Sequence, residues 1–207
     1  MNTFEMDLKR ALLSKGFVIG LIVEILILDK SGFATDVYLL FMPVVVAFPY
    51  ATAWLNDYNS GYIKLYLYRT GIGAYIFGKF VVSAISGGTM LVLSIIIAGW
   101  INKEVQVTAL ATVFASGCFW AAVATTMSAV TGSRYVAYGG GFVIYYMLVI
   151  IYERYFTSLY CLSPDEWICP AHTWVFGEYG VLLLLLGIAM VLYCVFYRVV
   201  RRCIARA

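Results

Sequence analysis

Long apolar runs alternate with short polar stretches along almost the whole chain. Each run is about as long as the ~20 mostly apolar residues that a helix needs to cross a bilayer. The runs cover residues 14–30, 37–56, 76–99, 108–131, 135–153 and 179–198. They lack the strict alternation of membrane β-strands. Backbone groups in lipid must pair within the protein. We therefore expect an all-α polytopic membrane protein with six transmembrane helices, forming a single membrane domain over 1–207.

Two shorter segments have amphipathic patterns. Residues 2–13 place apolar side chains on one stripe and charged ones opposite, which predicts an interfacial helix. Residues 57–69 carry aromatic side chains at helical spacing and predict a short cytosolic helix between the second and third spans. Such an aromatic stripe suits either the lipid headgroups or a groove in a partner protein.

The segment 153–178, between the fifth and sixth spans, is too polar to cross a membrane and too aromatic for a free loop. We expect it to be partly inserted at the outer interface, where aromatic rings are enriched. Cys161 and Cys169 lie in this segment, on the side where a disulfide can persist. A bridge between them and two free thiols both remain open.

Small residues recur in the third, fourth and fifth spans, including Gly87 and Gly88, Gly117, and the run 139–141. Small residues let helices approach closely in lipid. These three spans are therefore expected to form the packed interior, with the sixth more exposed to lipid.

Three residues within the first two spans stand out. Glu24 places a carboxylate inside the first span, where it is either a buried structural group or part of a transport path. Pro43 and Pro49 each remove a backbone donor from the second span and predict bends, which can serve packing or gating.

Composition and charge agree with a membrane location. Hydrophobic residues make up 63% of the chain and charged residues 12%, against ~45–50% and ~25% in ordinary soluble domains. With the N-terminus in the cytosol, 11 of the 14 lysines and arginines face inward, and the others are Lys30, Lys103 and Arg154. This positive-inside bias predicts a multi-pass plasma-membrane protein with both termini cytosolic.

Motifs of the common catalytic sites are absent from the sequence. A single histidine, His172, rules out a multi-histidine metal site. The chain has no phosphate-binding GxxxxGK[ST] loop and no HExxH or GxSxG motif. We expect a conduit or binder that is not itself an enzyme, binds no cofactor or metal, and has no nucleic-acid partner.

The layout of these elements resembles the membrane subunit of ATP-binding-cassette exporters of the type-2 permease family. The local resemblance lies in Asp57, Gly61, Gly78 and Lys79. In that family an acidic residue and a glycine begin the cytosolic helix, and a Gly-Lys pair begins the third span. The chain departs from the family at 70–73, where Thr-Gly-Ile-Gly replaces the usual Pro-x-x-Arg.

The resemblance implies two permease chains, alike or different, around a central path, each docked on a separate nucleotide-binding ATPase subunit that holds ATP and Mg. The segment 57–69 would be the coupling helix seated in the ATPase, the N-terminal helix would brace the ATPase, and the external segment would form the outer gate. The cargo would be an amphipathic or hydrophobic molecule, such as a peptide (a bacteriocin, for example) or a drug, exported from a bacterial cell. The residues assigned to ATPase coupling are Asp57, Tyr58, Gly61, Tyr62, Tyr66 and Arg69.

Two other functions stay open from the sequence. An ion-coupled carrier or channel would use Glu24 and would transport without ATP. An intramembrane enzyme, such as a lipid-modifying transferase, would need clustered acids or histidines within the spans, and the sequence lacks them.

Overall fold

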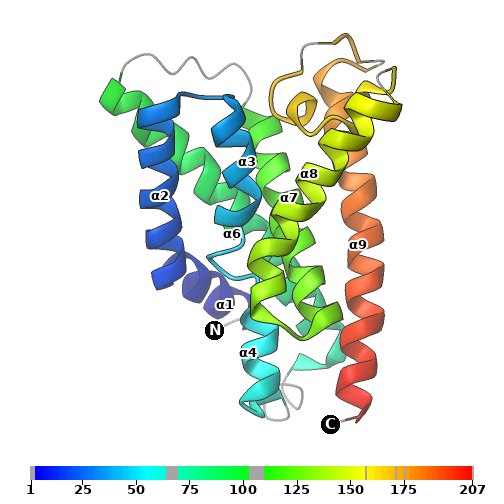
Figure 1. The fold of residues 1–207 in the computed structure, drawn as a ribbon. Coiled ribbons are helices and arrows are strands. Elements are labelled where there is room, and N and C mark those ends of the chain that lie inside the picture. The colour runs from blue at the N-terminus through cyan, green and yellow to red at the C-terminus, as the bar shows by residue number, and fades with distance from the viewer. Residues whose placement is uncertain are drawn as a thin grey trace.

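The computed structural model describes residues 3–63, 70–102, 110–156, 158–170, 172–174 and 176–206. Within these ranges the protein is helical and has no strand, which confirms the all-α part of the predicted fold class (Figure 1). The elements are α1 (Thr3–Leu12), α2 (Lys15–Ser31), α3 (Asp36–Val45), α4 (Ala53–Asn59), α6 (Ile72–Asn102), α7 (Leu110–Thr131), α8 (Arg134–Tyr155), η1 (Tyr160–Leu162), η2 (Asp165–Trp167) and α9 (Glu178–Arg206).

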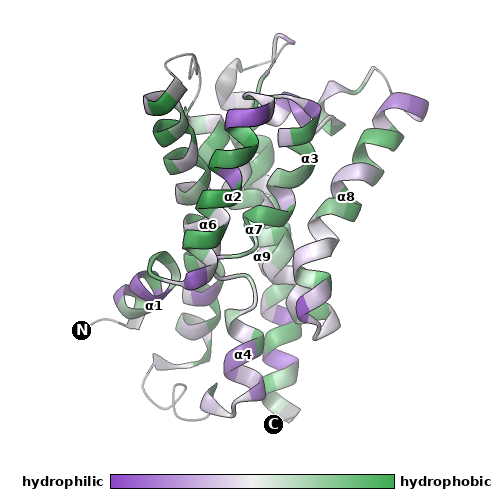
Figure 2. Cartoon of the chain, turned by 60° about the vertical axis from the view of Figure 1, so that its left-hand side comes forward, coloured by the Kyte–Doolittle hydropathy of each residue, from purple (hydrophilic) through white to green (hydrophobic). Residues whose placement is uncertain are grey.

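The described part contains four helices, α6 to α9, that are long and apolar enough to cross a membrane. A fifth span arises if α1 and α2, bent by 45° at their junction, count as one. The chain runs alternately toward the two ends of the bundle, so both termini lie toward the same end (Figure 1). Hydrophobic residues line the middle of the long helices, and hydrophilic ones gather toward their ends (Figure 2). These features suit a membrane-embedded helical protein.

The described residues do not confirm six full-length spans. Taken alone, α2 has 17 residues and α3 has 10. The second expected span, 37–56, is not one helix, because α3 ends at Val45 and the chain turns before α4 begins at Ala53. Pro43 and Pro49 lack the N–H that would continue the ladder of backbone hydrogen bonds.

Side chains from neighbouring helices form hydrogen bonds to backbone carbonyls in this irregular stretch. Residues Val46, Ala47 and Ala51 are buried, so their polar backbone groups need partners inside the protein. The Ser14 hydroxyl donates to the Pro49 carbonyl at 3.1 Å, and the Ser128 hydroxyl donates to the Ala51 carbonyl at 3.0 Å. The irregular backbone is therefore stabilised by side chains from the start of α2 and from α7.

The helices α6 and α7 pack with their backbones almost in contact. A Cβ atom added to Gly87 would lie 2.5 Å from the Cβ of Ala121, and one on Gly117 would lie 2.9 Å from the Cα of Gly88. In the most apolar stretch of α7, 72% of the residues are buried. The prediction that small residues bring the third and fourth spans together is confirmed.

The prediction that the fifth span also belongs to the interior is wrong. Only 17% of the apolar stretch of α8 is buried, the same share as in α9. Of the three glycines at 139–141, Gly141 packs on α3, where an added Cβ would lie 3.0 Å from the Pro43 carbonyl oxygen. A Cβ on Gly139 would meet nothing within 4 Å. Close approach therefore explains one glycine of the run, and α8 stands at the edge of the bundle.

We expect Gly88→Ala to destabilise the protein by about 1–3 kcal/mol through overpacking. The added methyl group would lie 2.7 Å from the Phe114 carbonyl oxygen, which is backbone and cannot rotate away. Thermal unfolding in detergent measures the change. The matched control is Gly139→Ala, which should be neutral or raise stability by up to about 1 kcal/mol because alanine favours helix. Equal behaviour of the two variants would contradict the close packing of α6 on α7.

Candidate functional site

Five polar side chains meet near the end of the bundle that carries the termini. Asp7 comes from α1, Tyr50 from the turn after α3, Asp57 from α4, and Tyr75 and Lys79 from α6. We call these five residues the Lys79 cluster. Tyr75 and Lys79 are four residues apart in one helix, so they share a face of α6.

The ammonium group of Lys79 is shared between two carboxylates. Its Nζ lies 3.0 Å from Asp7 Oδ1 and 2.8 Å from Asp57 Oδ2. Nζ also donates to the Tyr50 hydroxyl at 2.8 Å, and that hydroxyl donates to Asp7 Oδ1 at 2.7 Å. The Tyr75 hydroxyl donates to Asp57 Oδ2 at 3.2 Å. The ring centroids of Tyr50 and Tyr75 lie 5.1 and 5.6 Å from Nζ, within cation–π range.

The Lys79 cluster is buried. The side chain of Lys79 is 1% exposed, and those of Asp7 and Asp57 are 8% and 11% exposed. Removing a charge from water costs several kcal/mol, which is recovered only by close pairing and hydrogen bonds. If α1 and α4 both left α6, the buried ammonium of Lys79 would lose its counter-charges, and the departure of either helix breaks one buried ion pair. The cluster joins three segments that are far apart in the sequence.

The structure places the residues expected for ATPase coupling in different environments. Asp57 is buried in the Lys79 cluster, not presented on the surface. Tyr58 is half-buried and stacks on Trp54, with ring centroids 5.4 Å apart. Tyr62 is 44% exposed, so it is the described tyrosine of this segment that is best placed to meet a partner.

The single helix expected over 57–69 is interrupted near its start. The helix α4 starts earlier, at Ala53, and a turn follows at residues 60–61 before Tyr62 and Ile63 are helical again. Gly61 has a φ of +70°, a conformation that ends helices and that glycine adopts without strain. Tyr66 and Arg69, the other two expected coupling residues, lie outside the described residues.

A surface groove of about 370 Å³ lies beside the Lys79 cluster. Arg10 and Ser14 line it from the α1 side, and Asn56 and Ser60 line it from α4 and the following turn. Tyr50 and Asp57 also reach it. The groove therefore presents one cation and several hydrogen-bonding groups directly over the buried ion pairs.

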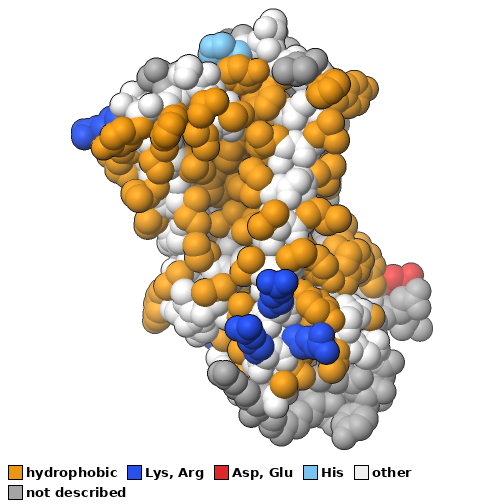
Figure 3. Space-filling view, turned by 90° about the vertical axis from the view of Figure 1, so that its right-hand side faces the viewer, with side chains coloured by type: hydrophobic (Ala, Val, Ile, Leu, Met, Phe, Trp, Pro, Cys, Tyr) orange, Lys and Arg blue, Asp and Glu red, His pale blue; other side chains and the backbone are white. Residues whose placement is uncertain are grey.

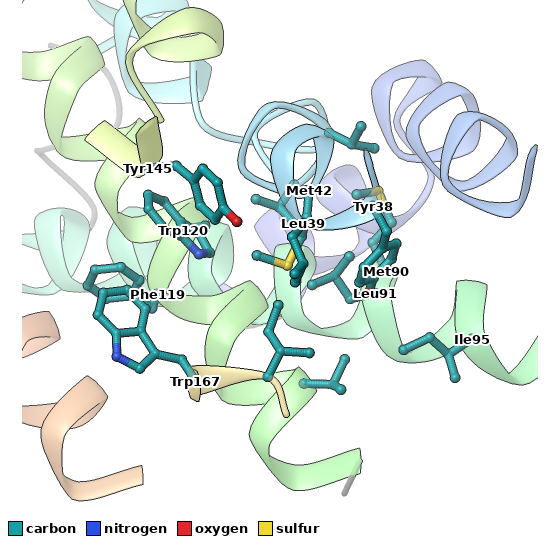
Figure 4. Packing of buried hydrophobic residues seen from close by; sticks show 14 of the residues in the cluster. Tyr38, Leu39, Met42, Met90, Leu91, Ile95, Phe119, Trp120, Tyr145 and Trp167 are labelled. Carbon is teal, nitrogen blue, oxygen red and sulfur yellow. The ribbon is translucent and has the colours of Figure 1, made fainter. Parts of the chain in front are cut away.

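At the opposite end of the bundle, the segment between α8 and α9, which the sequence analysis expects to be external and which we call the external segment, packs into the helices. The ring of Trp167 lies 5.1 Å from Phe119 and 6.0 Å from Trp120, centroid to centroid (Figure 4). The Ser116 hydroxyl donates to the Trp167 carbonyl at 2.9 Å. The Tyr145 hydroxyl of α8 donates to Asp165 at 2.7 Å. A packed, hydrogen-bonded segment fits the expectation that this region is more than a free loop.

His172 and the two cysteines complete this segment. His172 pairs with the carboxylate of Glu166, with Nδ1 2.8 Å from Oε1, and its ring stacks on Tyr160. Cys161 and Cys169 are free thiols, so the possible bridge between them is not formed in this structure. Cys161 lies in η1 and Cys169 follows η2, each turn having its own contacts. Burial raises the pKa of the Cys169 thiol, and the nearby Glu166 carboxylate raises it further.

Glu24 lies within the apolar stripe of α2. It is 0% exposed, and both carboxylate oxygens lack a hydrogen-bond partner among the described residues. The hydroxyl of Tyr38 on α3 is likewise buried without a described partner. Glu24 and the Lys79 cluster are separate, because Glu24 has none of the cluster's residues as a partner.

Sequence reasoning identified Lys79 and Asp57 but missed Asp7, Tyr50 and Tyr75. Asp7 was assigned only to the polar side of an amphipathic helix. A signal was present, because a lysine seven residues inside a 31-residue apolar helix needs a counter-charge. The sequence does not say which acidic residue supplies it.

Comparison with protein-family models, curated proteins and solved structures gives no match for this chain.

Lys79→Met should lower the stability of the folded protein by about 3–5 kcal/mol, because it leaves two buried carboxylates without their cation. Unfolding in detergent, followed by tryptophan fluorescence, measures the loss. Adding Asp7→Asn and Asp57→Asn to that variant should recover part of it. The control is Asp29→Asn, whose 3.9 Å pair with Lys30 is solvent-exposed and is expected to contribute below about 1 kcal/mol. A small effect of Lys79→Met would show that the buried ion pairs are not formed.

Proposed function

We propose that this chain is the membrane subunit of an ATP-driven exporter of the type-2 ATP-binding-cassette kind. It would work with a second permease chain and with a separate nucleotide-binding ATPase subunit, in a plasma membrane with both termini in the cytosol. The chain itself would hold no ATP. The proposal rests on the sequence resemblance and on the way the Lys79 cluster joins the predicted coupling segment to the membrane helices.

The main observation in support of this proposal is the ion pair between Asp57 and Lys79. The segment that the resemblance assigns to ATPase contact begins at Asp57, and this carboxylate lies 2.8 Å from an ammonium in the long helix α6. The same ammonium pairs with Asp7 on α1. A displacement of α4 by a partner is therefore transmitted to α6 and α1, because separating them exposes buried charges to an apolar environment. Such a linkage suits a motor that acts from one side of the membrane.

The partner would meet the surface next to this linkage. Tyr62 is exposed at the turn after α4, and the groove lined by Arg10, Asn56 and Ser60 lies over the cluster. An aromatic side chain beside hydrogen-bonding groups is the usual composition of a protein–protein contact. Asp57 and Tyr58 would act by holding α4 in place, because the cluster and Trp54 occupy them.

The other parts of the fold fit the same function. The path for an amphipathic or hydrophobic cargo would be closed on the outer side by the external segment. Its closure depends on Trp167 in the aromatic cluster and on the Ser116 hydrogen bond to its carbonyl. The interface with a second permease chain would lie on α8 and α9, whose apolar stretches are only 17% buried.

The decisive experiment is purification of the tagged chain together with an ATPase encoded beside it. Tyr62→Ala should reduce the co-purified ATPase at least fivefold, because it removes the exposed aromatic contact beside the cluster. The matched control is Tyr135→Ala, since Tyr135 is 89% exposed at the start of α8 and belongs neither to the groove lining nor to the Lys79 cluster. Transport by the chain alone in liposomes, without any ATPase, would refute the proposal.

A second candidate function is an ion-coupled carrier or channel. The specific observation in its favour is Glu24, a fully buried carboxylate with no described partner. The hydroxyl of Tyr38 is also buried without a described partner. Intramembrane carboxylates of this kind mark proton and ion pathways. In this reading a proton or cation would bind at Glu24 during each cycle.

Glu24→Gln separates the two candidates. If the chain is an ABC-type subunit, ATP-driven transport by the reconstituted complex should change by less than about twofold, because the neutral amide has nearly the same shape. If the chain is an ion-coupled carrier, the variant should abolish transport by the chain alone in liposomes under a pH gradient. Flux of a labelled amphipathic cargo, with and without ATP, is the measurement.

A further inference from the structure

Three arginines lie on a single face of α9, near its C-terminal end. Arg198, Arg201 and Arg202 are all exposed. Residues three and four positions apart in a helix are neighbours on its surface, so the three side chains share one face. They extend over about 6 Å of the helix axis at 1.5 Å per residue. Figure 3 shows three Lys or Arg side chains gathered below a hydrophobic surface on this side of the molecule.

The opposite face of the same helix end is packed against the protein. Phe196 and Val200 are 0% exposed, and they belong to a hydrophobic cluster with Trp54 of α4 and Ile76 of α6. This packing fixes the rotation of α9 about its own axis. The arginine face is therefore held toward the outside of the bundle.

The three arginines have no counter-charge in the part of the chain that the structure describes. None of them forms an ion pair with a described carboxylate. The acidic residue of α9, Glu178, begins the helix about 30 Å from Arg198. Asp57 on the neighbouring α4 is already paired with Lys79. A concentration of one sign of charge attracts an oppositely charged partner from outside the chain.

The arginine face continues an exposed apolar face of α9. Val191 and Val195 precede Arg198 by seven and three residues, a spacing that places them on the same side of the helix. They are 63% and 40% exposed. An exposed apolar face on a helix long enough to cross a membrane is suited to contact with acyl chains. The surroundings of the arginines are therefore the polar edge of a bilayer.

The axial positions of the arginines match that polar edge. Val195 is the last of the exposed large hydrophobic residues described in α9. Arg198 and Arg202 follow it by about 4.5 and 10.5 Å along the helix. The polar layer on each side of a bilayer is about 5–8 Å thick, and long basic side chains reach a few ångströms along it. With the hydrocarbon core ending near Val195, the guanidinium groups lie at the depth of the lipid phosphates.

We propose that Arg198, Arg201 and Arg202 bind the phosphate groups of anionic phospholipids, in the leaflet at the end of the bundle that carries the termini. A guanidinium group binds phosphate through two parallel hydrogen bonds. Each basic residue near a membrane surface favours anionic lipid roughly fivefold, so three together favour it roughly 100-fold. A second copy packed symmetrically against this helix end would oppose arginine to arginine, which is unfavourable.

This lipid site does not rest on the exporter proposal, because it needs only this chain and a bilayer. The test is native mass spectrometry of the full chain, purified in detergent with equal amounts of phosphatidylglycerol and phosphatidylcholine. The unaltered chain should retain at least fivefold more phosphatidylglycerol. Changing all three arginines to glutamine should lower the retained phosphatidylglycerol at least fivefold and leave phosphatidylcholine unchanged. Equal retention of both lipids by the unaltered chain would overturn the site, and so would undiminished phosphatidylglycerol on the glutamine variant.

Two double variants locate the effect. Arg201→Gln with Arg202→Gln should lower the retained phosphatidylglycerol at least threefold. The matched control is Lys30→Gln with Arg154→Gln, which removes the same charge from the last turns of α2 and α8. These turns lie at the end of the bundle away from the termini (Figure 1). The control should change retention less than 1.5-fold. Equal losses in the two double variants would overturn the site, because they would reflect net charge alone.

Lysine at the three positions separates the loss of charge from damage to the fold. The lysine variant keeps all three charges and should keep at least half of the bound phosphatidylglycerol. A loss as large as that of the glutamine variant would overturn the site. An acidic protein surface as the occupant gives a different result. The chain alone would then show no preference for phosphatidylglycerol, and the glutamine variant would lose the co-purified ATPase. That pair of results would overturn the lipid site and leave the exporter proposal standing.

Discussion

The position of a single buried cation constrains much of this fold. Lys79 places its ammonium within 3.0 Å of carboxylates from α1 and α4, and two tyrosine hydroxyls complete the hydrogen bonds. Two carboxylates in a nearly dry environment depend on this one ammonium, because removing it leaves both buried negative charges without their cation. The N-terminal helix, the segment after the broken second span and the long helix α6 are therefore fixed relative to one another, although the sequence separates Asp7 from Lys79 by 72 residues.

Hydroxyl side chains of α7 extend this order through the bundle. Near one end, Ser128 donates to the Ala51 carbonyl in the irregular stretch after α3, and near the other end Ser116 donates to the Trp167 carbonyl in the external segment. Between them, Gly117 brings α7 into backbone contact with α6. A helix that is packed this closely has little freedom to deform. Motion at the Lys79 cluster would therefore reach the external segment mainly through rigid displacement of α6 and α7, the kind of transmission that an exporter driven from one side needs.

The sequence predicted the parts of this structure that depend on local pattern. Apolar runs of helical length located α6 to α9, and the small residues at Gly87, Gly88 and Gly117 predicted the contact between the third and fourth spans. It failed where the outcome depends on distant partners. Pro43 and Pro49 predicted a bend. The full break before α4 is tolerated because the hydroxyls of Ser14 and Ser128 donate to backbone carbonyls that the break leaves outside a helix. The placement of Gly139–Gly141 in the interior was wrong, because only Gly141 has a close neighbour in α3.

The two buried acidic environments show how physical context separates structural from functional charges. Asp57 was expected on a docking surface because of its position in a motif, and its neighbours instead make it part of an internal brace. For Glu24 the sequence left a structural and a transport role open, and it is the one that lacks a described partner. A paired buried charge needs no further ligand to explain it, since its partner offsets the cost of desolvation. An unpaired one does need a ligand, because an isolated buried carboxylate is too costly to persist unless a proton or cation neutralises it. The Lys79 cluster is thus suited to transmitting movement, and Glu24 to binding a proton or cation.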